Sequence, residues 1–378
     1  MTGSHLKYMG SKRAMLKNGL GEMLNEAVPK ANRFVDLFTG SAAVATFVAQ
    51  NHDVGVIAND LQSYSKILAA SVITRIGPIN GQEIWDEWVK AVSANLCFNG
   101  APPFAPLSLG LVRQHREYSR ACRGSPITQA YGGHYFSVQQ ALEFDAFRKT
   151  TSANRHVASL QLAALIVAAS QCVASPGHTA QPFQPSETGI VYIQEAWRRS
   201  ASERIQRSLF ELSARYAKRE GIATLADANA MAETCLEGDL VFVDPPYSGV
   251  HYSRFYHVLE TIAHGDCGDV SGKGRYPSQE KRPRSSYSMK SQSLAAIDDL
   301  FAKLAKCGAT AAVTFPDREC SNGISGSDVR GLAKRYFQVA ERVIETKFSS
   351  MGGRGDGESR QAGRNARVPT NEILFHLT

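Results

Sequence analysis

The amino-acid sequence predicts an α/β protein with a Rossmann-like sheet and a subdomain inserted into the chain that forms the sheet. Two observations support this prediction. A short apolar strand, a glycine turn, a helix, a second strand and an acidic residue follow one another within residues 34–60. That order is typical of a βαβ nucleotide-binding unit. The alternation of strands and helices is absent from about residue 98 to 192 and resumes after residue 193.

The bulk composition limits the class of protein. A chain of 378 residues is long enough for one large core and an additional subdomain. Lysine and arginine total 42 against 35 acidic residues, and a net charge of +7 suits a polyanionic partner without naming one. The seven cysteines are scattered and never spaced as C-x-x-C, which argues against a disulfide framework or a zinc site and favours a reducing cytosol.

Targeting signals are not recognisable. The most apolar run, 160–169, is too short to span a bilayer. The N-terminus also lacks the apolar stretch of a signal peptide. We therefore expect a cytoplasmic protein that needs no metal ion.

The first part of the predicted core is residues 1–97. Apolar spacing predicts one helix over 14–27, and Phe34–Phe38 form a short apolar strand. A glycine turn leads into a helix that extends to Gln50. A second buried strand, 54–58, is closed by Asn59 and Asp60.

The predicted insertion comprises residues 98–192, and the second part of the core comprises residues 193–378. Three prolines and two glycines within 97–110 favour a loop, and one apolar helix is expected near 156–172. The core resumes with one long helix, predicted over 194–220 and ended by Gly221. The expected strands that follow are 222–225, 239–243, 309–315, 337–347 and 372–377.

The strongest chemical signal is Asp244-Pro245-Pro246-Tyr247, which follows the apolar strand 239–243. Two prolines cannot extend a central strand, so the backbone leaves the sheet at its carboxyl edge, where open α/β sheets bind ligands. The lone pair of an adenine amino nitrogen is delocalised into the ring. A carboxylate and a backbone carbonyl that accept its two N–H bonds would localise that lone pair, and a tyrosine ring would stack on a flipped base.

A second signal is the segment from Asp36 to Ser41 together with Asp60. Gly40 permits a tight turn close to a ligand, and a carboxylate after the second strand can hold ribose hydroxyls. The dinucleotide fingerprint G-x-G-x-x-G is incomplete here, because alanines stand at positions 42 and 43.

Together these motifs resemble the Dam-like family of DNA adenine methylases. The family's K-Y-x-G-S-K is matched at Lys7–Lys12, its D-x-F-x-G-S-G at Asp36–Ala42, its N-D at Asn59-Asp60 and its D-P-P-Y at residues 244–247. The family's closing E-L-L-F strand is similar to residues 372–375. One departure is Ala42, where the family usually has glycine. The resemblance covers both outer thirds of the chain and implies a target-recognition role for the insertion.

The resemblance also implies residue roles. S-adenosylmethionine would be held by residues of the N-terminal loop and of the strand ends, namely Tyr8, Gly10, Lys12, Asp36, Phe38, Gly40, Asp60, Asp227 and Asp244. Within that set, Asp60 would bind the ribose and Asp227 would lie near the cofactor's adenine. The catalytic residues would be Asp244, Pro245, Pro246 and Tyr247. The implied partner is double-stranded DNA, and whether a cognate restriction enzyme accompanies the protein stays open.

Basic residues supply candidate DNA contacts. Arg113, Arg116 and Arg120 recur at helical spacing, and they either contact phosphates or form a solvated helix face. A basic stretch at 273–290 includes Lys281, Arg282 and Arg284 and is interleaved with Tyr276 and Tyr287, which is typical of a clamp on a distorted strand. The glycine- and arginine-rich segment 352–367 is expected to become ordered on nucleic acid.

Other functions compete with adenine methylation of DNA. The same chemistry serves cytosine, RNA or a glutamine side chain, and the first motif residue separates most of these. Cytosine members of the family usually have serine there and glutamine-modifying relatives have asparagine, so Asp244 favours adenine. RNA stays open as a substrate, and so does a non-catalytic DNA-binding protein on the same fold. Carbon-5 methylation of cytosine is disfavoured, because it needs a nucleophilic thiolate and the chain has no Pro-Cys pair.

Overall fold

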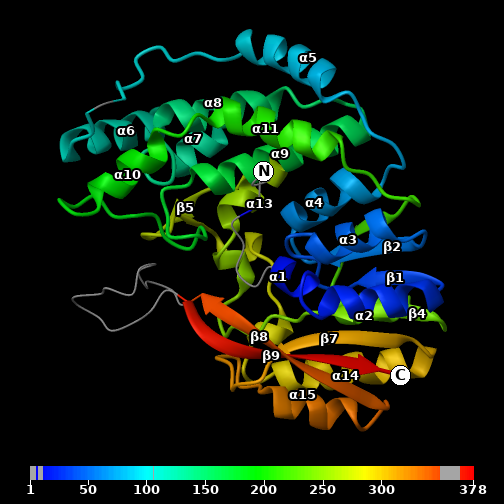
Figure 1. The fold of residues 1–378 in the computed structure, drawn as a ribbon. Coiled ribbons are helices and arrows are strands. Elements are labelled where there is room, and N and C mark those ends of the chain that lie inside the picture. Colours follow the sequence, from blue (N-terminus) through cyan, green and yellow to red (C-terminus); the bar gives the residue numbers. More distant parts are fainter. Residues whose placement is uncertain (1–5, 7–11, 105, 350–366) are drawn as a thin grey trace. The chain divides into compact units, whose positions relative to one another are not determined.

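A computed structural model describes residues 6, 12–104, 106–349 and 367–378, which form two compact units (Figure 1). The sheet unit comprises Met9–Ile76, Tyr216–Tyr252 and Pro283–Thr378. The helical unit comprises Met1–Tyr8, Gly77–Arg215 and Ser253–Arg282. Each unit is therefore assembled from segments that are distant in the sequence.

The sheet unit contains a seven-stranded sheet in the order β3-β2-β1-β4-β7-β9-β8. The strands are β1 Arg33–Asp36, β2 Gly55–Asp60, β3 Ile222–Leu225, β4 Asp239–Val243, β7 Thr310–Pro316, β8 Val339–Ser349 and β9 Arg367–Leu377. The first five strands in this order are parallel, and β9 runs antiparallel to both of its neighbours. This mostly parallel sheet confirms the predicted Rossmann-like α/β fold, and every predicted strand is present.

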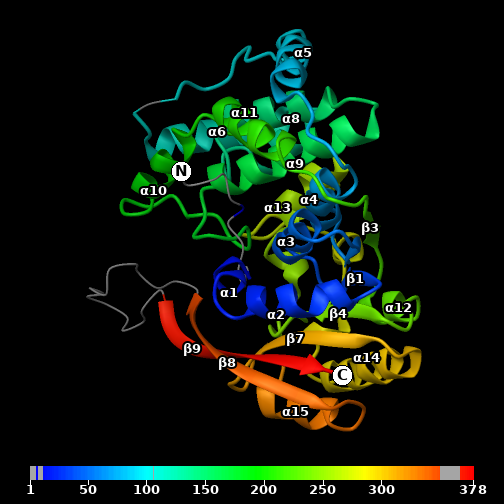
Figure 2. The same ribbon diagram turned by 45° about the vertical axis from the view of Figure 1, so that its right-hand side comes forward.

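The sheet is covered by helices on both faces. One face packs on α12 (Ala228–Ala232), α14 (Ser293–Cys307) and α15 (Gly326–Ala333), and Figure 2 shows α14 and α15 beside β7. On the other face, α3 (Ala43–Asn51) contacts β1 and β2, while α4 (Ser63–Ile73) contacts β2 and β3. All five residues of β4 are buried. A strand covered on both faces has a continuous apolar sequence, which is why β4 was recognisable.

The prediction of one continuous helix over 14–27 is wrong. The chain forms α1 (Arg13–Leu16) and α2 (Leu20–Ala27), which are separated by a turn. Gly19 has φ +87° in that turn, a conformation that glycine adopts without steric cost. An apolar pattern with helical spacing continues across the break because both short helices bury residues, among them Met15, Leu20 and Leu24.

The helical unit is built mainly from eight helices. They are α5 Gly81–Ser93, α6 Leu109–Ala121, α7 Pro126–Tyr131, α8 Val138–Lys149, α9 Arg155–Cys172, α10 Ile190–Trp197, α11 Ala201–Ser213 and α13 His257–His264. In Figure 1, α8, α9 and α11 run close together, and α9 contacts α8, α11 and α13. A helix surrounded by other helices is apolar over most of its surface, as α9 is. A two-stranded hairpin, β5 (Val270–Ser271) and β6 (Tyr276–Pro277), completes the unit.

The helical unit differs in its bounds from the predicted insertion 98–192. Its longest segment runs from Gly77 to Arg215, and the unit takes in a further segment, Ser253–Arg282, from beyond Asp244–Tyr247. The single helix predicted over 194–220 is wrong as well. It is two helices, α10 and α11, because Ser200 starts a new helix by accepting the backbone N–H of Glu203.

Among the residues that the structure describes, no helix is both long enough and apolar enough to cross a bilayer.

Candidate active site

The Asp244–Tyr247 loop leaves the sheet at the carboxyl end of β4 and is held in place by a neighbouring turn. The side chain of Asn322 is fully buried, and its Nδ2 donates to the carbonyl oxygens of Pro246 (3.1 Å) and Tyr287 (3.0 Å). The backbone N–H of Gly249 donates to Ser321 Oγ at 2.9 Å. The turn that contains Ser321 and Asn322 therefore positions the loop, a role that no local motif in the sequence indicated.

The Asp244 carboxylate has one occupied oxygen. Its Oδ1 accepts the Thr314 hydroxyl at 2.9 Å and lies 2.9 Å from Lys12 Nζ. No described residue donates to Oδ2. The side chain is 18% exposed, so this second oxygen can accept a hydrogen bond from a ligand. Burial raises the pKa of Asp244, Lys12 lowers it and Glu372 raises it again.

Lys12 lies between two carboxylates. Its Nζ is 2.9 Å from Asp244 Oδ1 and 2.6 Å from Glu372 Oε1, and its side chain is only 5% exposed. Burial alone would lower the pKa of Lys12, but Asp244 and Glu372 outweigh burial and raise it. The structure thus makes this residue, predicted as a cofactor contact, the counter-ion of Asp244 and Glu372. The pairing with Glu372 on β9 joins residues from the two ends of the chain.

Carboxylates predominate at this edge of the sheet. Asp36 is 1% exposed, and its Oδ1 accepts the backbone N–H of Phe38 at 3.3 Å. Burial raises the pKa of Asp36 well above its usual value, and the nearby charges of Asp244 and Asp60 raise it further. Four acidic residues thus lie close together, namely Asp36, Asp60, Asp244 and Glu372. Among the described contacts, Lys12 is the cation that pairs with two of them. Such a site favours a positively charged ligand.

The loop after β1 is tied to the loop after β2 by Asp60. One oxygen of Asp60 accepts the backbone N–H of Gly40 (2.7 Å), and the other accepts that of Gln62 (2.9 Å). The buried Gln62 Oε1 accepts from no described residue. Both Gly40 (φ +51°) and Ala42 (φ +58°) adopt the left-handed conformation. This explains why the family has glycine at the Ala42 position, since an alanine there carries backbone strain.

The sheet unit also contains a cavity of about 310 Å³. It is lined by Asp227, Asn229, Ser286, Gln292, Ala295, Ala296 and Asp299. Asp227 is exposed and caps α12 by accepting the backbone N–H groups of Asn229 and Ala230. The predicted cofactor contacts Asp36, Phe38, Gly40 and Asp60 thus share the carboxyl edge of the sheet, and Asp227 lines a cavity in the same unit.

Two tyrosines near the site differ in burial. Tyr247 is partly buried, its ring is edge-on to Phe315 at 6.5 Å between centroids, and burial raises its pKa. Tyr287, predicted as a stacking residue of the basic stretch, is 1% exposed. Its ring packs edge-on against Phe38 at 4.9 Å, and its hydroxyl donates to Asn229. The prediction for Tyr287 is therefore wrong, because this ring belongs to the core.

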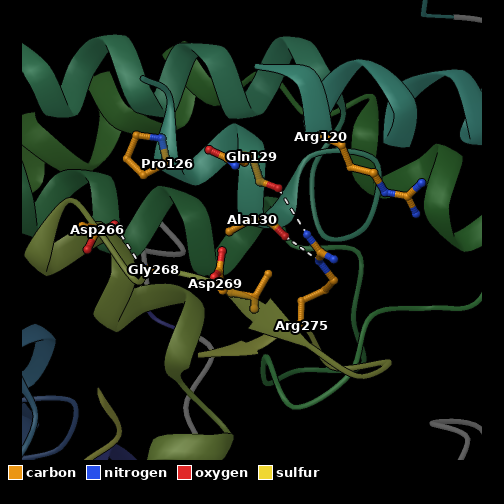
Figure 3. A pocket seen from close by; sticks show the side chains of 9 residues that line it. Arg120, Pro126, Gln129, Ala130, Asp266, Gly268, Asp269 and Arg275 are labelled. Atoms are coloured by element: carbon orange, nitrogen blue, oxygen red, sulfur yellow. Dashed lines mark hydrogen bonds between the residues drawn. The ribbon is translucent and has the colours of Figure 1, made fainter. Parts of the chain in front are cut away.

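The predicted arginines of 113–120 lie on α6. Arg113 and Arg120 are exposed, whereas Arg116 is partly buried and donates from Nε to the Gly133 carbonyl at 2.9 Å. Arg120 and Arg275 line a cavity of about 250 Å³ in the helical unit. Figure 3 shows the Arg275 guanidinium turned to the carbonyl groups of Gln129 and Ala130, to which it donates.

The remaining predicted DNA contacts fall into three environments. Lys281 is exposed and pairs with Asp266 at 3.3 Å, while Arg284 is exposed. Arg282 is partly buried, with its guanidinium 5.6 Å from the Tyr276 ring centroid. Tyr8, Gly10 and the side chains of segment 352–367 lie outside the described residues.

Known proteins that are similar to this chain are DNA methyltransferases. The model of the D12 class N6 adenine-specific DNA methyltransferase family matches residues 8–307. Modification methylase LlaI of Lactococcus lactis subsp. lactis is 23% identical over 305 residues, which cover 79% of this chain and 44% of that protein. Type II methyltransferase M.FokI of Planomicrobium okeanokoites is 27% identical, covering 71% and 38%. Type II methyltransferase M.NlaIII of Neisseria lactamica is 28% identical, covering 76% and 75%. The chain therefore spans less than half the length of the first two relatives.

Proposed function

The chain belongs to the family of D12 class N6 adenine-specific DNA methyltransferases, and on that premise we propose that it methylates the exocyclic amino group of adenine in double-stranded DNA. S-adenosylmethionine would supply the methyl group. The observation that carries the proposal is the open Oδ2 of Asp244, at the carboxyl edge of the sheet, in a loop that Asn322 holds in place.

The chain's own residues activate the amino group. Asp244 Oδ2 and the Pro245 carbonyl oxygen accept hydrogen bonds from its two N–H groups and so localise the lone pair of the nitrogen. Tyr247 stacks on the flipped base. Thr314 and Lys12 hold the other Asp244 oxygen, so the carboxylate keeps one orientation. Burial raises the pKa of Asp244, which makes Oδ2 a better acceptor for the proton that the nitrogen loses.

The residues of the site fit S-adenosylmethionine. Its sulfonium and ammonium groups are cationic, and the excess of carboxylates around Asp36 suits them. Asp60 would hold the ribose hydroxyls, and the buried Gln62 Oε1 can accept a further donor. Asp227 and the cavity beside it would take the adenine end. Phe38 and Gly40 would shape the turn against the cofactor, together with Tyr8 and Gly10 as the family resemblance implies.

DNA would be held by Arg113, Arg116, Arg120, Lys281, Arg282 and Arg284. The exposed positions of Arg113, Arg120 and Arg284 support this assignment, because phosphate contacts need accessible cations. A cognate restriction enzyme is a further proposed partner, supported by two relatives that are named as a modification methylase and a type II methyltransferase. A cleavage assay tests it, since DNA modified by this protein should resist an endonuclease of the same specificity.

A methylation map tests the proposed activity. The chain is expressed in a host without DNA methylation, and modified bases are read by single-molecule sequencing, with Asp244→Ala as the inactive variant. Asp53→Ala is the control, because Asp53 is an exposed residue that precedes β2 and pairs with Arg219. We expect N6-methyladenine in one sequence context for wild type and control alone. Methylcytosine, methylation confined to RNA, or DNA binding without any modification would each contradict the proposal.

A further inference from the structure

A tyrosine ring in the helical unit holds two arginines that the proposed catalysis does not use. The Cζ atom of Arg254 lies 4.7 Å from the centroid of the Tyr276 ring, and that of Arg282 lies 5.6 Å from it. Both guanidinium groups are thus within cation–π distance of one ring. Arg254 and Arg282 also stand near the two ends of the segment Ser253–Arg282, so the ends of this segment meet at Tyr276.

The Tyr276 ring is fixed in position. Its hydroxyl donates to the Ala180 carbonyl, and the buried His257 ring lies 4.9 Å away between centroids. Gly274 leaves the necessary space, because a Cβ atom there would lie 2.3 Å from Tyr276 Cζ and 2.4 Å from the Ala180 oxygen. A fixed ring keeps both guanidinium groups in one place even when no ligand is present.

Neither guanidinium has a carboxylate partner among the described residues. Arg282 Nε is buried and has no described acceptor. Asp266, which belongs to the same segment, does not pair with either arginine. Its carboxylate pairs with Lys281 at 3.3 Å and accepts the backbone N–H of Gly268. The positive charges of Arg254 and Arg282 are therefore held at one ring with no described carboxylate to neutralise them. A bound anion would supply the missing negative charge.

The titration behaviour of neighbouring groups agrees with a local excess of positive charge. Burial lowers the pKa of Arg282, and the charge of Arg254 lowers it further. Burial also lowers the pKa of His257 to about 4, and both arginines add to that shift. A bound anion would relieve this repulsion.

We propose that Arg254 and Arg282, held on Tyr276, form a binding site for a backbone phosphate of the DNA strand that carries the target adenine. Guanidinium groups match phosphate through paired N–H donors, and such contacts position a protein on the strand. Arg254 stands seven positions after Tyr247, so the phosphate would be held by the chain segment that directly follows the catalytic motif. The inference rests on DNA being the substrate and adds Arg254 as a positioning residue.

The salt dependence of DNA binding tests this site. We would compare the full chain with Arg254→Gln, Arg282→Gln and the double variant, using duplex DNA that contains the methylation site. Each true phosphate contact contributes about 0.9 to the slope of log affinity against log salt, so the double variant should lose about 0.9–1.8. Arg198→Gln, a change at an exposed arginine of the helical unit, is the matched control and should leave the slope unchanged.

Two further variants separate charge from packing. Arg254→Lys keeps the charge and should restore most of the slope, whereas Tyr276→Leu removes the ring and should weaken binding while leaving every cation in place. Thermal unfolding of each variant shows whether it folds. An unchanged slope in a folded double variant would falsify the proposal. Competition by millimolar inorganic phosphate as effective as that by duplex DNA would also overturn it, because the site would then serve free phosphate.

The outcome is distinguishable from failure of the proposed function. If wild type methylates DNA but the double variant keeps its salt slope, the phosphate site is wrong and the function stands. If wild type binds duplex DNA with the expected slopes but methylates nothing, the site stands and the function fails.

Discussion

At the scale of single residues, burial, Lys12 and Glu372 together set the pH at which the Asp244 carboxylate is charged. Burial raises the pKa of Asp244, Lys12 lowers it and Glu372 raises it. Protonation removes the negative charge of Asp244 and turns one of its acceptor oxygens into a donor, so activity falls as the pH drops through its pKa. Lys12→Met should therefore move the acid limb of the turnover–pH profile to higher pH. The exposed Lys17 offers the control Lys17→Met, and an acid limb that stays in place in both variants would contradict this role.

Tyr247 should act through its ring and not through its hydroxyl. Base stacking on an aromatic side chain is worth about 1–3 kcal/mol, so Tyr247→Ala should lower turnover by roughly 5- to 150-fold. Tyr247→Phe keeps the ring and should cost less than about threefold, well below 1 kcal/mol. Single-turnover rates with saturating DNA measure both. Equal losses in the two variants would show that the hydroxyl takes part in the reaction.

The buried Asp36 should oppose folding at neutral pH. Because burial raises its pKa, the protein gains stability when this group is protonated, and that stability is lost as the pH rises through the folded-state pKa. Asp36→Asn removes the buried charge and keeps an acceptor for the Phe38 N–H. We expect it to raise the free energy of unfolding at pH 7 by about 0.5–2 kcal/mol and to weaken cofactor binding. Urea unfolding at pH 5 and pH 8 checks the sign, since the gain should grow with pH.

At the scale of elements, the start of α3 is strained. Ala42 has φ +58°, which costs an L-residue about 1–2 kcal/mol, and its side chain is buried. Ala42→Gly should therefore leave stability unchanged or raise it by up to about 1 kcal/mol, after the entropy of glycine is included. Ala45→Gly, within the same helix, is the control and should cost about 1 kcal/mol. If Ala42→Gly also lowered the free energy of unfolding by about 1 kcal/mol, the left-handed conformation of Ala42 would not be destabilising.

Elements were predictable where local chemistry determines them. Strands buried on both faces have continuous apolar runs, so β1, β4 and β7 were recognisable. Helix continuity was not, because apolar spacing continued across Gly19 and across the break before Ser200. Among the helices of the insertion, α9 was predicted near 156–172, whereas α8 was missed because it is buried on several sides and lacks a single apolar stripe. One signal was available, since Ser137 and Gln140 form a capping box at the start of α8.

The candidate site divides in the same way. Asp36, Asp60 and Asp244 stand in short motifs whose chemistry can be read locally. The ion pair of Lys12 with Glu372 and the support of Pro246 by Asn322 bring together residues far apart in the chain, and only the sheet order determines them. Arg254 lay outside the basic stretch that the sequence singled out, and its place on Tyr276 depends on how the segment Ser253–Arg282 closes.

At the scale of the whole molecule, the helical unit depends on a segment that follows the catalytic motif. The Tyr131 hydroxyl bonds to that of Thr261 (2.8 Å), and Arg148 donates to the Ile262 carbonyl (2.8 Å). Arg275 likewise donates to the Ala130 carbonyl at 2.8 Å. The segment 253–282 thus satisfies buried polar groups of α7 and α8, which are costly to leave unpaired.

Gene exchange between relatives is constrained by this arrangement. Consider a recombinant that takes residues 77–215 from a distant relative and keeps its own residues 253–282. The two segments then come from different proteins, and the contacts that Thr261, Ile262 and Arg275 make with α7 and α8 are no longer matched. We expect such chimeras to aggregate on expression, whereas chimeras that inherit both segments should remain folded, as solubility and thermal unfolding would show. If the helical unit recognises the target, as the family resemblance implies, a new DNA specificity would arise by point substitution, or by two crossovers that exchange both segments, more readily than by the transfer of residues 77–215 alone.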